Sequence, residues 1–168
     1  MSRPALTLRS RAIGYLAQRE HSRVELRRKL LDAAARQQRL RAAAEGGEPP
    51  DALGAAAEQE VDALLDWLTG KGLLSPERFV ESRIHARAPR YGNLRIRQEL
   101  AQHGVALEPD AADALQASEL DRARAVWIKR YGGVAPDAAG RARQARFLTA
   151  RGFSSEVVRR VVAGRSGD

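Results

Sequence analysis

The chain has 168 residues, and its 29 Lys and Arg against 21 Asp and Glu give a formal net charge of +8. This length fits one or two small domains and excludes a large multidomain machine. The lack of cysteine excludes disulfide frameworks, thiolate zinc sites and iron–sulfur clusters. There is neither an apolar run of about 18 residues nor an apolar signal core after Met1, so we expect a cytoplasmic protein with no membrane span.

Charge is segregated along the chain. Basic and acidic residues number 11 and 3 over 1–41, 0 and 7 over 42–66, 7 and 3 over 67–105, 0 and 5 over 106–121, and 11 and 3 over 122–168. Of the 29 basic residues 26 are Arg, as a GC-rich genome would produce, so the total alone indicates little. The segregation is more informative, because it predicts distinct basic and acidic helices.

Helix-forming residues dominate and the apolar spacing has a period of 3.6, which predicts an all-α protein. Near the start, Ser22 and Glu25 form a capping box that opens a helix with Leu26 and Leu30 turned inward. The apolar stripe of the next helix is Val61, Leu64, Leu65 and Leu68. The first three helices are expected over residues 6–19, 22–44 and 58–70.

A second set of helices begins at Ser75-Pro76-Glu77, where serine caps, proline needs no N–H donor, and glutamate faces the positive helix end. Phe79, Val80 and Ile84 are expected to turn inward. Gly104 followed by Val105 predicts a Schellman-type helix end. The three helices are expected over residues 76–88, 93–103 and 109–117.

A third set ends its middle helix in the same way, at Gly152-Phe153. Ser154-Ser155 is interpreted as the cap of the last helix rather than as a nucleophile. That helix carries an apolar stripe of four valines at 157, 158, 161 and 162. The helices are expected over residues 119–131, 138–151 and 154–163.

The three sets form a repeat. Leu100 and Leu148 are 48 positions apart, whereas Leu30 and Leu100 are 70 apart, an excess of 22. Residues 36–57 number 22 and carry only two bulky apolar residues, so they are interpreted as an insertion: helical to about Glu45, then a flexible loop over 48–57. We therefore expect three tandem three-helix modules (1–75, 76–118 and 119–168) stacked into an elongated, curved monomer.

The basic helices are the candidate binding surface. If the modules stack in register, their arginines form a semi-continuous basic stripe suited to a long polyanion or a filament. In the alternative interpretation these arginines pair with glutamates at i, i+4 and cover apolar surface with their stems. The candidate residues are Arg23, Arg27, Arg83, Arg87, Arg90, Arg95 and Arg97.

No pattern for catalysis or cofactor binding is present. His21, His85 and His103 have no second ligand at metal-binding spacing on the same helix face, and no glycine-rich phosphate loop precedes a helix. The pairs Glu77/Glu81 and Asp62/Asp66 are typical of solvated helix surfaces. We expect no metal, no cofactor and no enzymatic activity.

Four motifs in order resemble the RecX family of bacterial regulators of the RecA recombinase, over about residues 8–162. Each motif alone is a helix cap or a helix end, but their joint order and spacing are specific. The chain departs from the common pattern in the 36–57 insertion and in Ser75-Pro76. The motifs are Ser22-x-x-Glu25-Leu26-x-x-Lys29-Leu30, Gly72-Leu73-Leu74-Ser75-x-x-Arg78-Phe79, Gly92-x-x-Arg95-Ile96-x-x-Glu99-Leu100-x-x-x-Gly104-Val105, and Arg151-Gly152-Phe153 with Val157.

The resemblance implies a protein that binds RecA filaments along their groove and restrains ATP hydrolysis and strand exchange, sometimes with weak binding of single- or double-stranded DNA. Since the apolar motif residues explain the fold, function is expected on Arg83, Arg87, Arg90 and Arg95. Two alternatives stay open: a stand-alone nucleic-acid binder resembling helix-turn-helix units, and a helical scaffold for an acidic protein partner. Helix 93–103 lacks the varied polar set that base edges demand, which argues against base-specific recognition.

Overall fold

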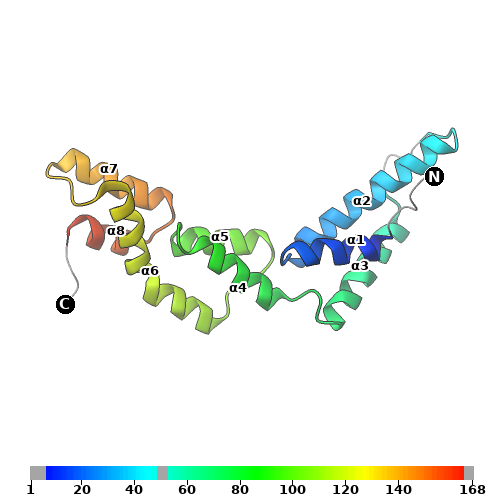
Figure 1. The fold of residues 1–168 in the computed structure, drawn as a ribbon, viewed down its shortest axis with the longest axis horizontal. Coiled ribbons are helices and arrows are strands. Elements are labelled where there is room, and N and C mark those ends of the chain that lie inside the picture. The colour runs from blue at the N-terminus through cyan, green and yellow to red at the C-terminus, as the bar shows by residue number, and fades with distance from the viewer. Residues whose placement is uncertain (1–6, 49–52, 165–168) are drawn as a thin grey trace. The chain divides into compact units, whose positions relative to one another are not determined.

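The computed structural model describes residues 7–48 and 53–164, and within these ranges every regular element is an α-helix. The predicted all-α class is confirmed. The helices are α1 (Leu8–Gln18), α2 (Arg23–Ala44), α3 (Ala55–Gly70), α4 (Pro76–Arg87), α5 (Asn93–Gln102), α6 (Pro109–Tyr131), α7 (Ala138–Ala150) and α8 (Ser155–Val162) (Figure 1).

The chain divides into two compact units, and each is described by itself. Unit 1 comprises residues 1–79 and unit 2 residues 80–168, so the division falls within α4. In unit 1, α2 packs against both α1 and α3 (Figure 1). In unit 2, α6 packs against α5, α7 and α8, and α7 also packs against α8.

The core of unit 1 is made by the stripes expected from the sequence. Leu26, Leu30, Val61, Leu65 and Leu68 are fully buried, together with Ala12 of α1 and Leu74. Leu64 and Trp67 pack against them and are half-buried. Burial of a large aliphatic side chain contributes roughly 1.5–3 kcal/mol, so these stripes hold the three helices together.

The core of unit 2 forms around α8. Its four predicted valines are all buried, and they pack against Trp127 of α6, Leu148 of α7 and Phe153. Tyr131 and Phe147 meet edge to face at the rim of this cluster, with ring centroids 5.3 Å apart. Ile96 and Leu100 of α5 and Leu115 of α6 are also buried.

The two predicted serine caps and the two predicted glycine stops are confirmed. Ser22 Oγ accepts the Glu25 N–H at 3.1 Å, and Ser75 Oγ accepts the Arg78 N–H at 3.2 Å. At the two glycine stops, the Val105 N–H donates to Leu100 O at 3.1 Å and the Phe153 N–H to Leu148 O at 3.3 Å. Both glycines have the left-handed backbone that a Schellman motif requires.

The predicted break between helices 109–117 and 119–131 is wrong, because α6 runs unbroken from Pro109 to Tyr131. No glycine or proline stands between Gln116 and Asp121 to end a helix. The Ser118 hydroxyl, which would have to cap a new helix, instead donates to the carbonyls of Ala114 and Leu115 one turn earlier.

The insertion is partly helical. Its first part, 36–44, prolongs α2 as expected, and Gly46 ends the helix with a φ of 70°. Its last residues, 55–57, were expected in a loop but form the first turn of α3, since three consecutive alanines favour helix. The expected loop over 48–57 falls partly on residues 49–52, which lie outside the described residues.

Replacing residues 46–53 with a Gly/Ser linker of equal length is expected to change the melting temperature by less than about 2 °C. The segment lies between α2 and α3 and adds only Leu53, which is half-buried, as bulky apolar surface. Loop-closure entropy depends weakly on composition at fixed length. Thermal unfolding followed by circular dichroism checks this, and a broad, uncooperative transition would show that the loop stabilises the unit.

His21 is buried in unit 1 and held in its neutral form. Its Nδ1 lies 2.9 Å from Arg19 O and its Nε2 lies 3.0 Å from Lys29 Nζ. A lysine ammonium can only donate, so Nε2 accepts and the Nδ1–H donates. Burial is the main cause that lowers the pKa of His21 below its usual value.

Because His21 is buried, we expect the folded protein to lose stability in acid. With the folded-state pKa below the unfolded value of about 6.5, the unfolded chain takes up the proton first, so the free energy of unfolding falls as pH decreases from 7 to 5. Denaturant titrations at several pH values measure this. His21→Gln should flatten the decline, whereas His85→Gln, at an exposed site on α4, should not. An unchanged decline in His21→Gln would assign the effect to another group.

Candidate functional site

The seven candidate arginines fall in both units. Arg83 and Arg87 lie on α4, Arg90 in the loop that follows it, and Arg95 and Arg97 on α5, all within unit 2. Arg23 and Arg27 lie on α2 in unit 1. The two groups are therefore separate candidate surfaces.

The arginines of α2 are balanced by the acidic α3. Arg23 Nη2 lies 2.7 Å from Asp66 Oδ1. Arg27 donates from Nε to Asp62 Oδ1 at 2.7 Å and from Nη2 to Asp62 Oδ2 at 3.1 Å. Its Nη2 also donates to Glu58 Oε2 at 3.2 Å. The Arg27 guanidinium lowers the pKa of Asp62. The i, i+4 pairing of the alternative interpretation is not found for these two arginines, which pair instead with carboxylates of a neighbouring helix.

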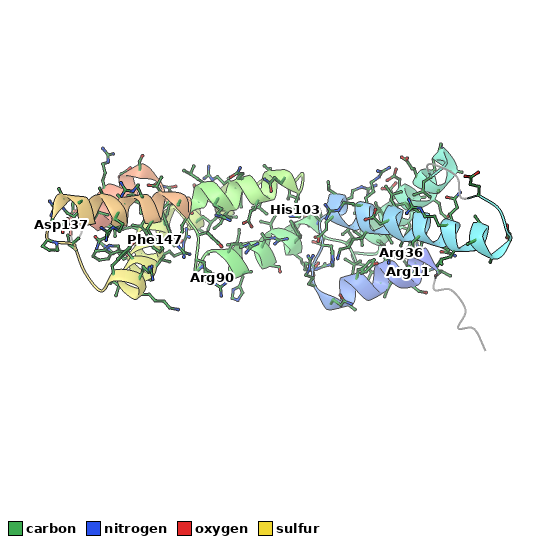
Figure 2. All side chains as sticks on the ribbon, turned by 90° about the horizontal axis from the view of Figure 1, so that it is seen from above. Arg11, Arg36, Arg90, His103, Asp137 and Phe147 are labelled. Carbon is green, nitrogen blue, oxygen red and sulfur yellow. The ribbon has the colours of Figure 1, made fainter. Side chains whose placement is uncertain are left out.

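In unit 2, three guanidinium groups surround one tyrosine ring. The Cζ atoms of Arg87, Arg95 and Arg151 lie 5.7, 4.4 and 5.9 Å from the Tyr91 ring centroid. Arg151 also lies 4.6 Å from the ring of Phe147, which Figure 2 shows on α7. Cation–π contacts of this kind contribute about 0.5–1 kcal/mol each at exposed sites. We call Arg87, Tyr91, Arg95 and Arg151 the Tyr91 cluster.

The Tyr91 cluster has a surplus of positive charge. Glu99 is the carboxylate that pairs with it, 2.8 Å from Arg87 Nε and 3.7 Å from Arg95 Nε. This carboxylate thus pairs with two of the three guanidinium groups, and Arg151 makes no ion pair with any described residue. Arg90 stands beside them: its carbonyl accepts a hydrogen bond from Arg151 Nη1 at 3.2 Å, and its exposed side chain makes no ion pair with any described residue (Figure 2).

Two glycines bring the cluster together by letting two loops touch through their backbones. The Gly92 N–H donates to Arg151 O at 2.9 Å, and the Leu94 N–H donates to Gly152 O at 3.1 Å. A Cβ at Gly92 would lie 2.2 Å from Gly152 O, and a Cβ at Gly152 would lie 2.6 Å from the Arg95 Cβ. The close approach therefore requires glycine at both positions.

A buried carboxylate of α6 stabilises this contact between the segments around Gly92 and Gly152, which we call the junction. Glu119 of α6 is fully buried, and its oxygens accept the N–H of Asn93 at 2.9 Å, the N–H of Ser154 at 3.3 Å and the Ser154 hydroxyl at 3.0 Å. It thus satisfies free donors at the starts of both α5 and α8. Ser154 is the N-cap residue of α8, as expected, but its hydroxyl serves Glu119 rather than the helix.

Arg122 extends this support to the loop after α4. Its guanidinium donates to the carbonyls of Ala88 at 3.2 Å and Tyr91 at 2.7 Å, and to Asn93 Oδ1 at 2.5 Å. Burial is the main cause that lowers the pKa of Arg122. The loop that carries Arg90 and Tyr91 is therefore fixed by α6.

The structure brings together only part of the predicted set. Arg87 and Arg95 join the Tyr91 cluster, and Arg90 borders it, whereas Arg83 lies one turn earlier on α4. Arg97 is exposed and lines a shallow depression with Leu107. Arg151 was missed because its motif was interpreted only as a helix end. The two glycine motifs could have revealed it only if their contact had been known.

The residues that the structure describes contain no group of three or more His, Cys, Asp or Glu placed to hold a metal ion. Asp62 and Asp66 pair with arginines, and Glu77 accepts the Ser75 hydroxyl at 2.8 Å, so these carboxylates have structural partners. Among the helices that the structure describes, none is long and apolar enough to cross a membrane.

Comparisons with known proteins give a consistent result. The second and third three-helix domains of RecX match residues 77–115 and 117–162. The regulatory protein RecX of Ralstonia pickettii is 46% identical over 166 residues, covering 98% of this chain and 91% of that protein. The regulatory protein RecX of Leptothrix cholodnii is also 46% identical, covering 96% and 90%.

A solved structure of a regulatory protein RecX shares the fold, with a TM-score of 0.63 at 20% identity. The alignment covers 94% of this chain and 70% of that one. The family models together match just over half of the chain, and the relatives align along nearly all of it. The chain therefore belongs to the RecX family of regulatory proteins.

Proposed function

We propose that the protein binds RecA filaments and inhibits RecA ATP hydrolysis and strand exchange, with the Tyr91 cluster and Arg90 as its main contact surface. The observation that carries this proposal is the surplus of guanidinium groups around Tyr91. Arginine forks pair with phosphates and with carboxylates, and a nucleoprotein filament presents both. The rigid junction beneath the cluster supports such a role, because preorganised side chains lose less entropy on binding.

The mechanism proposed is competition. A monomer seated in the filament groove bridges neighbouring RecA protomers and blocks the incoming duplex or further growth of the filament. The protein acts in the cytoplasm, without a cofactor and without catalysis. Arg83 and Arg97 are proposed as secondary contacts, and Arg23 and Arg27 as weaker ones because their charge is already balanced by α3.

A RecA ATPase assay on single-stranded DNA, with this protein titrated in, tests the proposal. Replacing Arg87, Arg95 and Arg151 by alanine is expected to raise the half-inhibitory concentration at least about tenfold. Loss of a single charge-assisted contact worth about 1.4 kcal/mol already gives that factor. Melting should fall moderately, since the variant removes three cation–π contacts of about 0.5–1 kcal/mol each, and inhibition is therefore compared at a temperature where circular dichroism shows the native helical content.

A matched triple variant distinguishes the effect of the Tyr91 cluster on inhibition from the effect of net charge. Arg143, Arg159 and Arg160 lie on α7 and α8 in the same unit, are exposed, and lie outside the Tyr91 cluster. Their replacement by alanine removes the same charge and should change inhibition less than about threefold, an effect of about 0.6 kcal/mol. Equal losses in the two triple variants would contradict a contact surface at Tyr91.

The second candidate, direct nucleic-acid binding, is favoured by the tyrosine ring among arginines, which resembles a base-stacking platform. The salt dependence of binding distinguishes direct nucleic-acid binding from filament binding. Binding to naked DNA should fall steeply with salt because counterions are released, whereas filament binding should persist through its protein contacts. Equal affinities and equal salt slopes for naked DNA and filament would show that the polyanion is the real target.

A further inference from the structure

Unit 1 contains a groove between α1 and α2, far from the Tyr91 cluster in sequence. Arg11 and Tyr15 of α1 form one wall, and α2 forms the other from Lys29 to Ala44. Figure 2 shows Arg11 and Arg36 close together on the facing sides of the two helices. The groove has a volume of about 510 Å³, and we call it the α1–α2 groove.

The groove exists because α2 is longer than its partner needs. α1 has 11 residues and α2 has 22. The buried residues of α2 end at Ala33, and Leu40, about two turns later, is 68% exposed. Residues 36–44, the helical part of the insertion, therefore present an apolar surface that the unit-1 core does not cover.

The rim of the groove is cationic. Lys29, Arg36 and Arg41 line it from α2 and Arg11 lines it from α1, against one acidic residue, Asp32. Among the described residues, Arg36 and Arg41 make no ion pair, in contrast with Arg23 and Arg27 on the first turns of the same helix. The positive charge at the projecting end of α2 is thus left for a partner.

An apolar floor inside a basic rim fits an acidic amphipathic peptide. Ala33, Leu40, Ala44 and the Tyr15 ring would contact its apolar side chains, while its carboxylates would pair with Arg36 and Arg41. A nucleic-acid backbone would satisfy the arginines but leave the apolar floor uncovered. From Lys29 to Ala44 the wall is about 22 Å long, the length of a helical peptide of about 15 residues.

We propose that the α1–α2 groove binds an acidic amphipathic segment of a partner protein, with the insertion in α2 supplying the wall that makes the site. The proposal is independent of the Tyr91 cluster. It assigns to unit 1 a protein-binding site that works without DNA. Its test uses the full chain and no RecA, so its failure and the failure of filament inhibition are distinguishable.

Fluorescence anisotropy with three probes tests the site. The first is a labelled 15-residue peptide with glutamates on one helical face and leucines at i, i+4, i+7 and i+11 on the other. The second has the same charge with every leucine replaced by serine. The third is an unlabelled 15-nucleotide oligothymidine used as a competitor. We expect the leucine peptide to bind at least about tenfold more tightly than the serine peptide, and the oligothymidine not to displace it.

Paired variants locate the binding. Arg36→Glu with Arg41→Glu should weaken binding of the leucine peptide at least about tenfold. Arg28→Glu with Arg39→Glu makes the same charge change at exposed positions of α2 that do not line the groove, and it should change binding less than about threefold. Leu40→Ser should also weaken binding, and all variants should keep the native helical content by circular dichroism.

Three results would overturn the proposal. No saturable binding of the leucine peptide would show that the groove does not accept such a segment. Equal losses in the two double variants, with equal binding of both peptides, would reduce the effect to bulk charge. Displacement by oligothymidine with no effect of Leu40→Ser would assign the surface to nucleic acid.

Discussion

Replacing Gly92 by alanine is expected to lower the free energy of unfolding of unit 2 by about 3 kcal/mol or more. The new Cβ would lie 2.2 Å from both Gly152 O and Phe153 N, and backbone atoms cannot move aside as a flexible side chain can. Overpacking of buried sites commonly costs about 1–3 kcal/mol, and here two hydrogen bonds between the loops would also be lost. Gly152→Ala should be at least as damaging, because Gly152 also has a φ of 83°.

Substitutions at two other glycines distinguish the steric clash of a new Cβ from the cost of a left-handed backbone. Gly132 has a φ of 74° with open space around it, so Gly132→Ala reports the backbone conformation alone, about 1 kcal/mol. Gly14 lies inside α1 with nothing near its missing Cβ, so Gly14→Ala should raise stability by up to about 1 kcal/mol. Trp127 in the unit-2 core reports unfolding of that unit when Trp67 is replaced by Phe. A loss at Gly92 no larger than at Gly132 would refute the steric explanation.

Glu119→Ala is expected to lower the free energy of unfolding by about 3–5 kcal/mol. It leaves the N–H groups of Asn93 and Ser154 without their acceptor in a buried site, and it removes the charge that balances the half-buried Arg122. Glu119→Gln keeps one acceptor oxygen and should lose less. Both losses appear in denaturant unfolding followed by Trp127 fluorescence.

Glu81→Ala is the control for this pair, because Glu81 is an exposed carboxylate on α4 and should change stability by less than about 0.5 kcal/mol. The two glutamates are otherwise the same residue type in the same unit. If Glu119→Ala were as mild as Glu81→Ala, the buried carboxylate would not be stabilising the junction.

Local chemistry made much of the fold predictable. The starts at Ser22 and Ser75 follow from the geometry of a serine cap, and the ends at Gly104 and Gly152 from the left-handed backbone of glycine. These signals act within a few residues, so a sequence carries them directly. The valine stripe of α8 was equally clear, because its period points one face inward.

The binding surface was less predictable, since it depends on contacts between distant residues. Arg151 meets Tyr91 only because Gly92 and Gly152 allow two loops to touch, and no pattern within either motif reports that approach. In the sequence, Glu119 cannot be distinguished from the exposed carboxylates of other helices, because its two N–H partners are far away along the chain. For the same reason the pairing of Arg27 with Asp62, 35 residues later, could not be foreseen from helix spacing.

The continuity of α6 has a consequence for how the molecule unfolds. The second and third three-helix domains both draw on this one helix, about 34 Å long. Repeats joined by a loop can melt one after another, but two repeats that share a rigid element lose their packing together. Within unit 2 the segment that unfolds in one cooperative step is therefore larger than a single three-helix repeat. A fragment cut at Ser118 would divide α6 into two short helices, and each would lose part of its packing.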